Sequence, residues 1–599
     1  MQQDRAVEAD EKQQKAMLRR ALDKAAIQEA LARLVTKRNL PDKCVEWPEF
    51  HAVFLACNPA ITDEIPSAHS HLTTIIDRTF EDHRQVLARH LQQARSNIHL
   101  TVDGWTSPNR KALLAICAHF IDDTYRMCKV LLALPELRNG KGGDEQAAVV
   151  IPVLEQYSIA EKIGFITSDN HGSNDILCLA VQNHLKTSYQ LKWNAKEKRL
   201  RCQGHVINIA VKAFLFGKDK SAVEEAFRQI NHRTWQADEE SDVLMSDILQ
   251  GSRNWREIGP LGKLHNIAVH IRSSEARYKT FRDFGASKTL GLDNDTRWNS
   301  WYKLIERAVE LEMHVDRYTK EFHDSLRNDH LSPEDWMQLR DTRDFLAPFH
   351  RATLSAEGSF ATLDQTILTM DILLEHFKLS KEKFSGNSRL VSRLLIGWYA
   401  LDKYYLKTED SPAYAAAVIL NPACRKKYIS TNWKKDWHKK AFRDTRTMWD
   451  SEYKKRDAPA CTEQKPQRLD AFDVLRQRLQ VTGESSFQDE YESYANADPE
   501  PLKGSPLDWW MKEENRERYP CLSKMAMNIL SAPPMSAEPE RVFSGARRTI
   551  SWERMRLESA NIEKKECLKS WIGSGITEDR FVVGDESLVL IGGSSEPEV

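Results

Sequence analysis

The hydrophobic pattern at the beginning of the chain is helical. Residues 1–36 are rich in Ala, Lys, Glu and Gln, and Ile27, Leu31 and Leu34 recur at the spacing of one helical face. Two further stretches with helix-forming composition follow, at 45–55 and 67–95. The sequence therefore predicts a helical packing region up to residue 95.

At Asn97 the hydrophobic period changes from helical to strand-like. Ile98, Leu100 and Val102 alternate with polar residues, which predicts a strand whose polar side, including Asp103, faces away from the apolar side. A turn is expected at 104–109. Two more β-rich runs, 113–121 and 126–134, complete a predicted three-stranded meander.

The following segments alternate between helix and strand. Helical patterns at 145–157 and 175–185 flank a short apolar strand that ends at Ser168. The order βββαβα is that of a ribonuclease-H-like fold, with a mixed sheet and helices on its faces. From about Ala210 to Trp449 the pattern is helical. We therefore expect an α+β protein: a ribonuclease-H-like core interrupted by a large all-α insertion, with helical N-terminal and C-terminal parts.

Shifts in pattern and composition also suggest domain boundaries. The interval 455–505 has little apolar periodicity, and the last residues resemble a loose tail. The expected parts are a helical N-terminal region (1–95), the first part of the core (96–215), the helical insertion (216–454), a linker (455–505), a C-terminal region that completes the core (506–573) and the tail (574–599).

Two aspartates stand where strands are expected to end. Asp103 lies at the end of the first strand and Asp169 at the end of the fourth, and these strands are neighbours in the predicted topology. Close carboxylates repel each other unless a cation holds them, and Mg²⁺ (or Mn²⁺) takes one or two carboxylates together with phosphate oxygens. Taken singly, an Asp after a strand is more often a turn former or a helix cap.

Composition narrows the classes of protein. At 599 residues the chain is too long for one core, and its net charge of −1 means that any surface for nucleic acid must be a local patch. The ten cysteines are scattered, which favours a reduced intracellular compartment over a disulfide scaffold. No run reaches the roughly eighteen apolar residues of a membrane span, so no membrane partner is expected.

The C-terminal stretch SAPPMSAEPERVFSGARRT predicts a capped amphipathic helix. Pro533 and Pro534 end what precedes them, Ser536 is a candidate N-cap, and Glu538 and Glu540 lie in the expected first turn. From periodicity alone, this is a packing helix. A helix that begins in this way can also hold one carboxylate rigidly at the edge of a core.

Two further motifs have more than one interpretation. Cys202 and His205 form a Cys-x-x-His pair, but a structural zinc needs four ligands and no second pair is found, so a buried Cys with a hydrogen-bonded His is the default. Trp298 is either a core anchor or a platform for an extruded base, with Arg297 on phosphate. A basic, Trp-containing stretch at 425–440 either follows a phosphate backbone or forms a solvated helix.

Several of these segments together resemble one family. The runs VDGWTSPN, TSDNHGSND, RCQGHVINI, TRWNS and SAEPERVFS, in this order, resemble the hAT (hobo–Activator–Tam) superfamily of DNA transposases, and the last resembles its C-terminal dimerisation region. The resemblance implies that Asp103, Asp169 and Glu540 are the catalytic, metal-binding acids. It implies that His205 lies near the scissile phosphate and that Trp298, with Arg297, stacks on a flipped base. The role of Cys202 in its motif stays open.

The resemblance also implies a reaction and partners. We expect Mg²⁺- or Mn²⁺-dependent cleavage and strand transfer on transposon ends and target DNA, in the nucleus, by a homodimer or higher oligomer. A non-catalytic, DNA-binding or dimerising descendant is the alternative, because no BED-type zinc finger is found upstream of residue 40. A plain ribonuclease-H-like nuclease is a third, less favoured hypothesis, because the C-terminus resembles a dimerisation region.

Overall fold

The computed structural model describes residues 17, 22–58, 60–61, 64–217, 255–286, 288–292, 298–358, 361–454, 489–550 and 554–577. The chain divides into two compact units, the first formed by Met1–Ala195 with Ser536–Val599 and the second by Lys196–Met535. The first unit is thus assembled from both ends of the chain.

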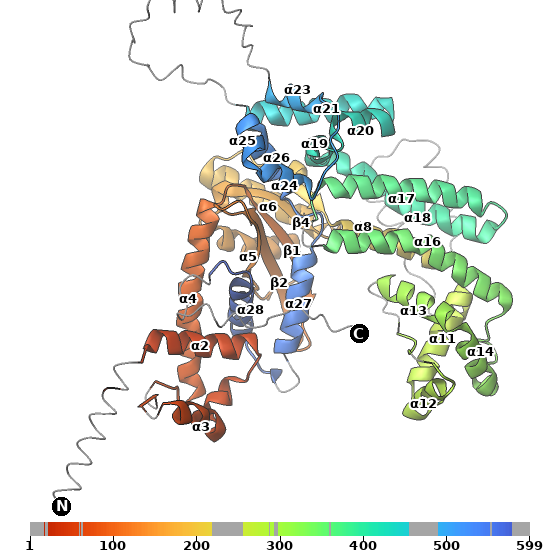
Figure 1. Ribbon diagram of the computed structural model, residues 1–599, viewed down its shortest axis with the longest axis horizontal. Helices are drawn as coiled ribbons and strands as arrows, with labels where there is room; N and C mark the ends of the chain where they lie inside the picture. The colour runs from red at the N-terminus through yellow and green to blue at the C-terminus, as the bar shows by residue number, and fades with distance from the viewer. Residues whose placement is uncertain are drawn as a thin grey trace, which may run out of the picture. The chain divides into compact units, whose positions relative to one another are not determined.

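The first unit begins with helices and continues into a sheet (Figure 1). Its N-terminal elements are α2 (Lys24–Lys37), η1 (Asp42–Glu46), α3 (Pro48–Cys57) and α4 (His69–Gln93). The next elements are β1 (Ile98–Thr106), β2 (Ala112–Ile121), β3 (Met127–Ala133), α5 (Gly143–Gln156), η3 (Ala160–Lys162), β4 (Ile163–Ser168) and α6 (Ser173–Tyr189). The second unit begins within α7 (Ala195–Lys198) and includes β5 (Arg199–Arg201).

The sheet is mixed and has five strands in the order β3-β2-β1-β4-β5. β1 pairs antiparallel with β2 and parallel with β4, and β2 pairs antiparallel with β3. The order βββαβα along the chain is therefore as predicted, and the expected α+β fold class is confirmed.

The first strand is longer than the sequence predicted. Gly104, Trp105 and Thr106, expected in a turn, continue the ladder opposite residues 112–114 of β2. The turn follows instead at 107–110, where the Ser107 N–H donates to the Lys111 carbonyl (2.9 Å) and Arg110 has a φ of 62°. Asp103 therefore lies within β1 rather than at its end, because β2 is long enough to keep pairing beyond it.

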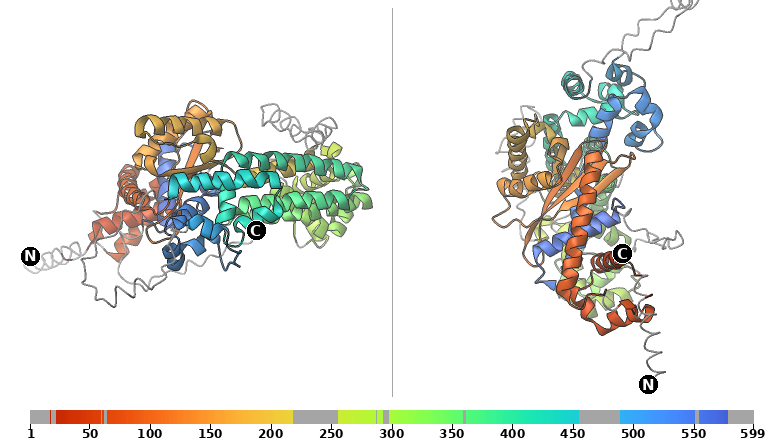
Figure 2. Two further views of the ribbon diagram at one scale, coloured as in Figure 1. Left: turned by 90° about the horizontal axis from the view of Figure 1, so that it is seen from above. Right: turned by 90° about the vertical axis from the view of Figure 1, so that its left-hand side faces the viewer.

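Two C-terminal helices, α27 (Ala537–Thr549) and α28 (Ser559–Gly573), complete this unit. α27 packs against β1, β2 and β3, while α5 and α6 lie together on the other side of the sheet (Figure 2). As a result His99 and Thr101, expected on a polar face, are fully buried. The local alternation did not reveal this burial, because the covering helix lies more than 430 residues later in the chain.

α28 covers the edge strand of the sheet. The Leu131 N–H of β3 donates to Ser570 Oγ (2.9 Å), and the indole N–H of Trp571 donates to the Leu131 carbonyl (2.6 Å). The Leu134 N–H donates to Glu563 Oε1 (2.9 Å). Backbone groups of an edge strand that would otherwise be open to pairing are thus satisfied by side chains of a helix.

The second unit is helical in its described residues apart from β5 (Figure 1). Its longest helices are α16, α17 and α18, and α18 packs closely along α8. The elements up to residue 357 are α8 (Gln203–Phe216), η4 (Trp255–Ile258), α11 (Pro260–Arg272), α12 (Glu275–Asp283), α13 (Trp298–Glu310), α14 (Glu312–Glu321), α15 (His323–Leu326) and α16 (Pro333–Glu357). The remaining elements are α17 (Asp364–Lys383), α18 (Ser388–Leu406), η5 (Lys407–Asp410), α19 (Ala413–Leu420), α20 (Arg425–Asn432), α21 (Lys435–Met448), η6 (Trp449–Tyr453), α23 (Glu490–Ala495), α24 (Pro506–Met511), α25 (Glu513–Arg518) and α26 (Leu522–Leu530).

Some expectations fall on residues outside the described ranges. These are Arg297, the part of the expected linker at 455–488 and the tail from residue 578. The described part of the expected linker interval contains α23. Within the described ranges, no helix has the length and apolar character needed to cross a membrane.

Candidate active site

The register of the sheet brings Asp103 and Asp169 to the same level. Thr101 of β1 lies opposite Thr167 of the parallel neighbour β4. Each aspartate follows its threonine by two residues, so both are expected on the same face and at the same edge of the sheet. The structure thus brings together the two acids that the sequence placed near the ends of neighbouring strands.

Local hydrogen bonds orient both carboxylates. The Gly104 N–H donates to Asp103 Oδ1 (2.8 Å). Asp169 Oδ1 accepts from the His171 N–H (3.0 Å) and from Asn174 Nδ2 (2.5 Å) in the first turn of α6. The Asp169 side chain is therefore fixed by the loop and helix that follow its own strand.

Both aspartates line one cavity of about 190 Å³ in the first unit. Its cationic side chain is Lys141, from the Gly-rich loop before α5, whose Nζ donates to Thr106 Oγ1 (2.6 Å). Gln146 of α5 is buried in the wall and donates through Nε2 to the Lys141 carbonyl and to Ser173 Oγ. The cavity combines two carboxylates, an ammonium group and the first turn of α6.

The donor set of this cavity suits a hard divalent cation. Mg²⁺ and Mn²⁺ prefer carboxylate, carbonyl and water oxygens, and Asp103 and Asp169 offer two carboxylates. Gln146 Oε1 is buried and, within the described chain, has no hydrogen-bond partner, so it is a further oxygen donor in the wall. Among the described residues, no group of three or more His, Cys, Asp or Glu side chains is close enough to hold a metal ion. The fit therefore rests on two aspartates and not on a preformed set of three acids.

Glu540, the third predicted acid, does not line this cavity. It lies half-buried in the first turn of α27, three residues before Phe543. The Phe543 ring stacks on Trp105 of β1 (5.4 Å between centroids), two residues beyond Asp103. α27 thus runs along the strand that carries Asp103, but it leaves the Glu540 carboxylate outside the cavity. The helix begins directly after Ser536 as predicted, although the Ser536 side chain makes no capping hydrogen bond.

The sheet face beneath α27 contains a neutral histidine. Thr101 Oγ1 and His119 Nε2 are hydrogen-bonded at 2.9 Å. Burial, with smaller contributions from nearby Lys129 and His99, lowers the pKa of His119 well below its ordinary value. His119 is therefore uncharged at neutral pH and acts as a structural partner of β1.

The Cys202-x-x-His205 pair lies at the start of α8 in the second unit. Cys202 is the buried N-cap residue, and His205 is in the first helical turn and half-buried. This turn packs against the segment before α27, since the Gln203 N–H donates to the Pro534 carbonyl (3.0 Å) and Gly204 lies against Met535. None of the nine described cysteines is paired in a disulfide.

Trp298 is the first residue of α13 and is only 2% exposed. Its ring lies edge-on to Tyr302 and His350 within the hydrophobic core of the second unit, and its backbone N–H donates to Asn208 Oδ1 (3.2 Å). This position is that of a core anchor, the first of the two alternatives. The surface of the ring is already packed in this structure, and the stacking role implied by the family stays a prediction.

The basic stretch at 425–440 is largely neutralised within the second unit. Four of its cations pair with carboxylates: Arg425 with Glu500, Lys426 with Glu492 (2.9 Å), Lys427 with Asp498 (3.0 Å) and Lys440 with Glu409 (2.7 Å). Each of these pairs reduces the positive charge left for phosphates. A continuous phosphate track is therefore disfavoured here.

Comparison with protein families connects these elements. Residues 490–572, which include α27 and all but the last residue of α28, match the hAT family C-terminal dimerisation region. The chain belongs to the hAT superfamily. Two further matches agree with its fold: residues 101–197 match the ZBED1 RNase-like domain and residues 200–345 the ZBED1 RNase-like helical domain.

Relatives of this hAT protein have different names. A protein of Talaromyces stipitatus, provisionally named a transcriptional regulator (tpeD), is 26% identical over 90% of this chain and 60% of its own length. The zinc finger BED domain-containing protein DAYSLEEPER of Arabidopsis thaliana is 22% identical over 92% of this chain and 74% of its own. A Zea mays protein provisionally named an AC transposase is 21% identical over 85% and 61%. The hAT chain thus spans about 60% of the length of the first of these relatives.

Sequence reasoning missed the residues that build the rest of the hAT cavity. Lys141 lies in the segment NGKGG, which predicted only a loop, and Gln146 lies on the inner face of a helix. His171 stands within the quoted run TSDNHGSND, two residues after Asp169. Its proximity to an acid was the available signal, while Lys141 and Gln146 are brought in by tertiary packing.

Proposed function

We propose that this hAT chain is a DNA transposase that cleaves DNA and transfers strands with a divalent metal ion. Its expected partners are transposon ends, target DNA and further copies of itself, and its expected compartment is the nucleus. The observation that carries the proposal is the cavity lined by both Asp103, on β1, and Asp169, directly after the parallel neighbour β4.

The roles within the cavity follow from its chemistry. Asp103 and Asp169 would hold Mg²⁺ or Mn²⁺, which neutralises charge on the phosphate oxygens when bound. Lys141 presents an ammonium group to the same space, so it would attract a DNA phosphate. His171 and Asn174 keep the Asp169 carboxylate in one orientation through their hydrogen bonds.

The family resemblance also assigns roles to residues outside the cavity, and the structure supports these roles to different degrees. We propose Glu540 as the third acid, recruited when DNA binds, because α27 follows the strand of Asp103 while the carboxylate lies outside the cavity. His205 is proposed to contact phosphate from the first turn of α8, and Cys202 to pack there. Arg297, outside the described residues, is proposed to contact phosphate. For Trp298 the burial supports an anchor of the helical core instead of a stacking platform.

A non-catalytic, DNA-binding or dimerising descendant is the second candidate function. It is favoured by the absence, among the described residues, of a group of three side chains suited to a metal ion. Both candidates share the family fold, so only a measurement of chemistry separates them.

A cleavage assay tests the proposal. The full chain is incubated with plasmid DNA that carries the sequences flanking its own gene, with Mg²⁺, with Mn²⁺ or with EDTA. Nicks and hairpin ends that form only with metal are the expected result. Binding of this DNA without any strand breakage under either metal would favour the non-catalytic descendant.

The assembly state is a second prediction. We expect the full chain to elute with at least twice the 69.0 kDa mass of one chain in light-scattering chromatography, because it contains the dimerisation region of the family. The whole chain is needed, since α24–α26 belong to one compact unit and α27 and α28 to the other. A mass of one chain at micromolar concentration would contradict a stable homo-oligomer.

A further inference from the structure

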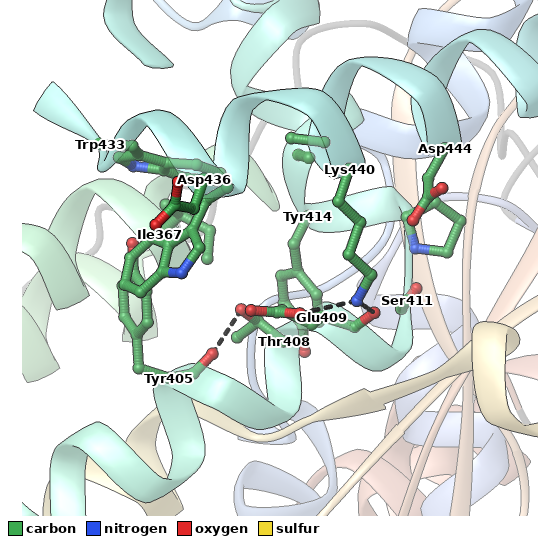
Figure 3. A pocket seen from close by; sticks show the side chains of 14 residues that line it. Ile367, Tyr405, Thr408, Glu409, Ser411, Tyr414, Trp433, Asp436, Lys440 and Asp444 are labelled. Atoms are coloured by element: carbon green, nitrogen blue, oxygen red, sulfur yellow. Dashed lines mark hydrogen bonds and ion pairs between the residues drawn. The ribbon is translucent and has the colours of Figure 1, made fainter. Parts of the chain in front are cut away.

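The second unit contains a cavity that the proposed DNA chemistry does not use. It has a volume of about 290 Å³ and is enclosed by α18, η5, α19 and α21. Figure 3 shows Trp433, Asp436 and Tyr405 on one side, Lys440 with Glu409 in the middle and Asp444 on the other side. Pockets for drug-sized ligands span about 300–1,000 Å³, so this cavity matches one side chain better than a nucleotide.

Hydrogen bonds to one carboxylate fix the aromatic side chains along one wall of the cavity. Asp371 of α17 accepts hydrogen bonds from Tyr405 Oη (2.7 Å), Tyr428 Oη (2.9 Å) and Trp433 Nε1 (3.1 Å). Trp437 packs against Tyr405 (5.8 Å between ring centroids). Since these rings are already ordered, a guest that stacks on them loses little of its binding energy to ordering the wall.

The charge of the lining is negative. Lys440 Nζ donates to the Glu409 carboxylate (2.7 Å) and to the Glu409 carbonyl (3.2 Å). The Lys440–Glu409 pair is therefore neutral as a whole. Among the described residues, the Asp444 carboxylate is paired only with the exposed Arg443, and the Asp436 carboxylate makes no hydrogen bond or ion pair. The excess of carboxylates excludes a phosphate and favours a cation.

Aromatic rings here already attract a cation. The Lys434 ammonium lies 5.2 Å from the centre of the Trp437 ring, although Lys434 is not part of the cavity lining. Aromatic faces bind cations through their quadrupole, and Trp does so best. The cavity adds a carboxylate, Asp436, one turn before Lys440 on the same helix.

We propose that this cavity binds an arginine side chain from a segment of a partner protein. A guanidinium is planar, stacks on aromatic rings and donates in a fork that matches a carboxylate, whereas an ammonium is a compact and strongly hydrated charge. The guest would stack on the wall of Trp437 and Tyr405 and donate to Asp436. The inference does not depend on DNA cleavage, because the cavity lies wholly within the second unit.

The test is fluorescence anisotropy of the full chain with a labelled nonapeptide of glycine and serine that contains one central arginine. We expect saturable binding that weakens about tenfold when citrulline, which is uncharged, replaces the arginine. Asp436→Asn is expected to cause a similar loss, and since Asp436 is exposed this variant keeps the fold. Trp437→Phe, which keeps an aromatic ring, is expected to weaken binding less than Asp436→Asn.

Asp498→Asn is the matched control, because Asp498 is a highly exposed acid of the same unit outside the cavity. It should leave peptide binding unchanged. Equal binding of the arginine and citrulline peptides, displacement of the peptide by single-stranded DNA, or a loss of self-association in Asp436→Lys would each overturn the proposal. The last two would assign the cavity to nucleic acid and to a second copy of this chain.

Discussion

Replacing Asp103 with asparagine is expected to reduce metal-dependent DNA cleavage about 10²- to 10³-fold. Metal-ion stabilisation of a phosphoryl-transfer transition state contributes several kcal/mol, and each 1.36 kcal/mol is a factor of ten in rate. The asparagine keeps the size of the side chain and an oxygen for the Gly104 N–H, so the fold of β1 should be retained. The rate of nicking of the flanking DNA, measured with Mg²⁺ and with Mn²⁺, is the test.

The same substitution at Asp123 provides the control. Asp123 is exposed in the turn between β2 and β3 and does not line the cavity, so Asp123→Asn should cleave as the unchanged chain does. DNA binding and oligomer mass should be normal in both variants. Full cleavage activity in Asp103→Asn would remove Asp103 from the site and leave the cavity without its proposed role.

Replacing Trp298 with alanine is expected to lower the stability of the second unit by about 3–5 kcal/mol. Truncation of a buried Trp removes apolar contact and leaves a cavity that the neighbours fill only partly. Trp298 is 2% exposed and lies against Tyr302 and His350, so little relaxation is available. The shift of the unfolding transition in urea, followed by far-ultraviolet circular dichroism, measures the effect.

Trp298→Phe separates packing from base stacking. Phenylalanine fills part of the same space, so it should recover part of the stability that alanine loses. An unchanged unfolding transition in Trp298→Ala, together with a selective loss of hairpin formation on DNA, would contradict the anchor role. That result would return Trp298 to the stacking role implied by the family.

The strands were predictable because their signals are local. The alternation around Leu100 and Val102 and the apolar runs of β2 and β4 gave strand positions within one or two residues, except at the end of β1. The sequence placed the end of β1 too early, because Gly104 and Thr106 are typical turn residues and the pairing with β2 cannot be seen in the sequence. Local patterns identify a strand, but its length depends on its neighbour.

The site was only partly predictable for the same reason. Asp103 and Asp169 were recognisable because β1 and β4 are parallel neighbours, although Asp103 lies within β1 and not at its end. Lys141 and Gln146 carry no pattern of their own and reach the cavity only through folding. The burial of Trp298 was also not readable, because an amphipathic helix and a stacking platform present the same sequence.

The closure of the β3 edge by α28 sets an order for biosynthesis. Leu131 and its partner Trp571 are separated by 440 positions, and the whole second unit is translated between them. A nascent chain therefore exposes an incomplete β-sheet on the ribosome until α28 emerges, and an open strand of this kind invites pairing with other chains. Gene copies with a stop codon shortly before Trp571 are then expected to yield insoluble protein. Their truncated chains should not enter mixed oligomers and inactivate them.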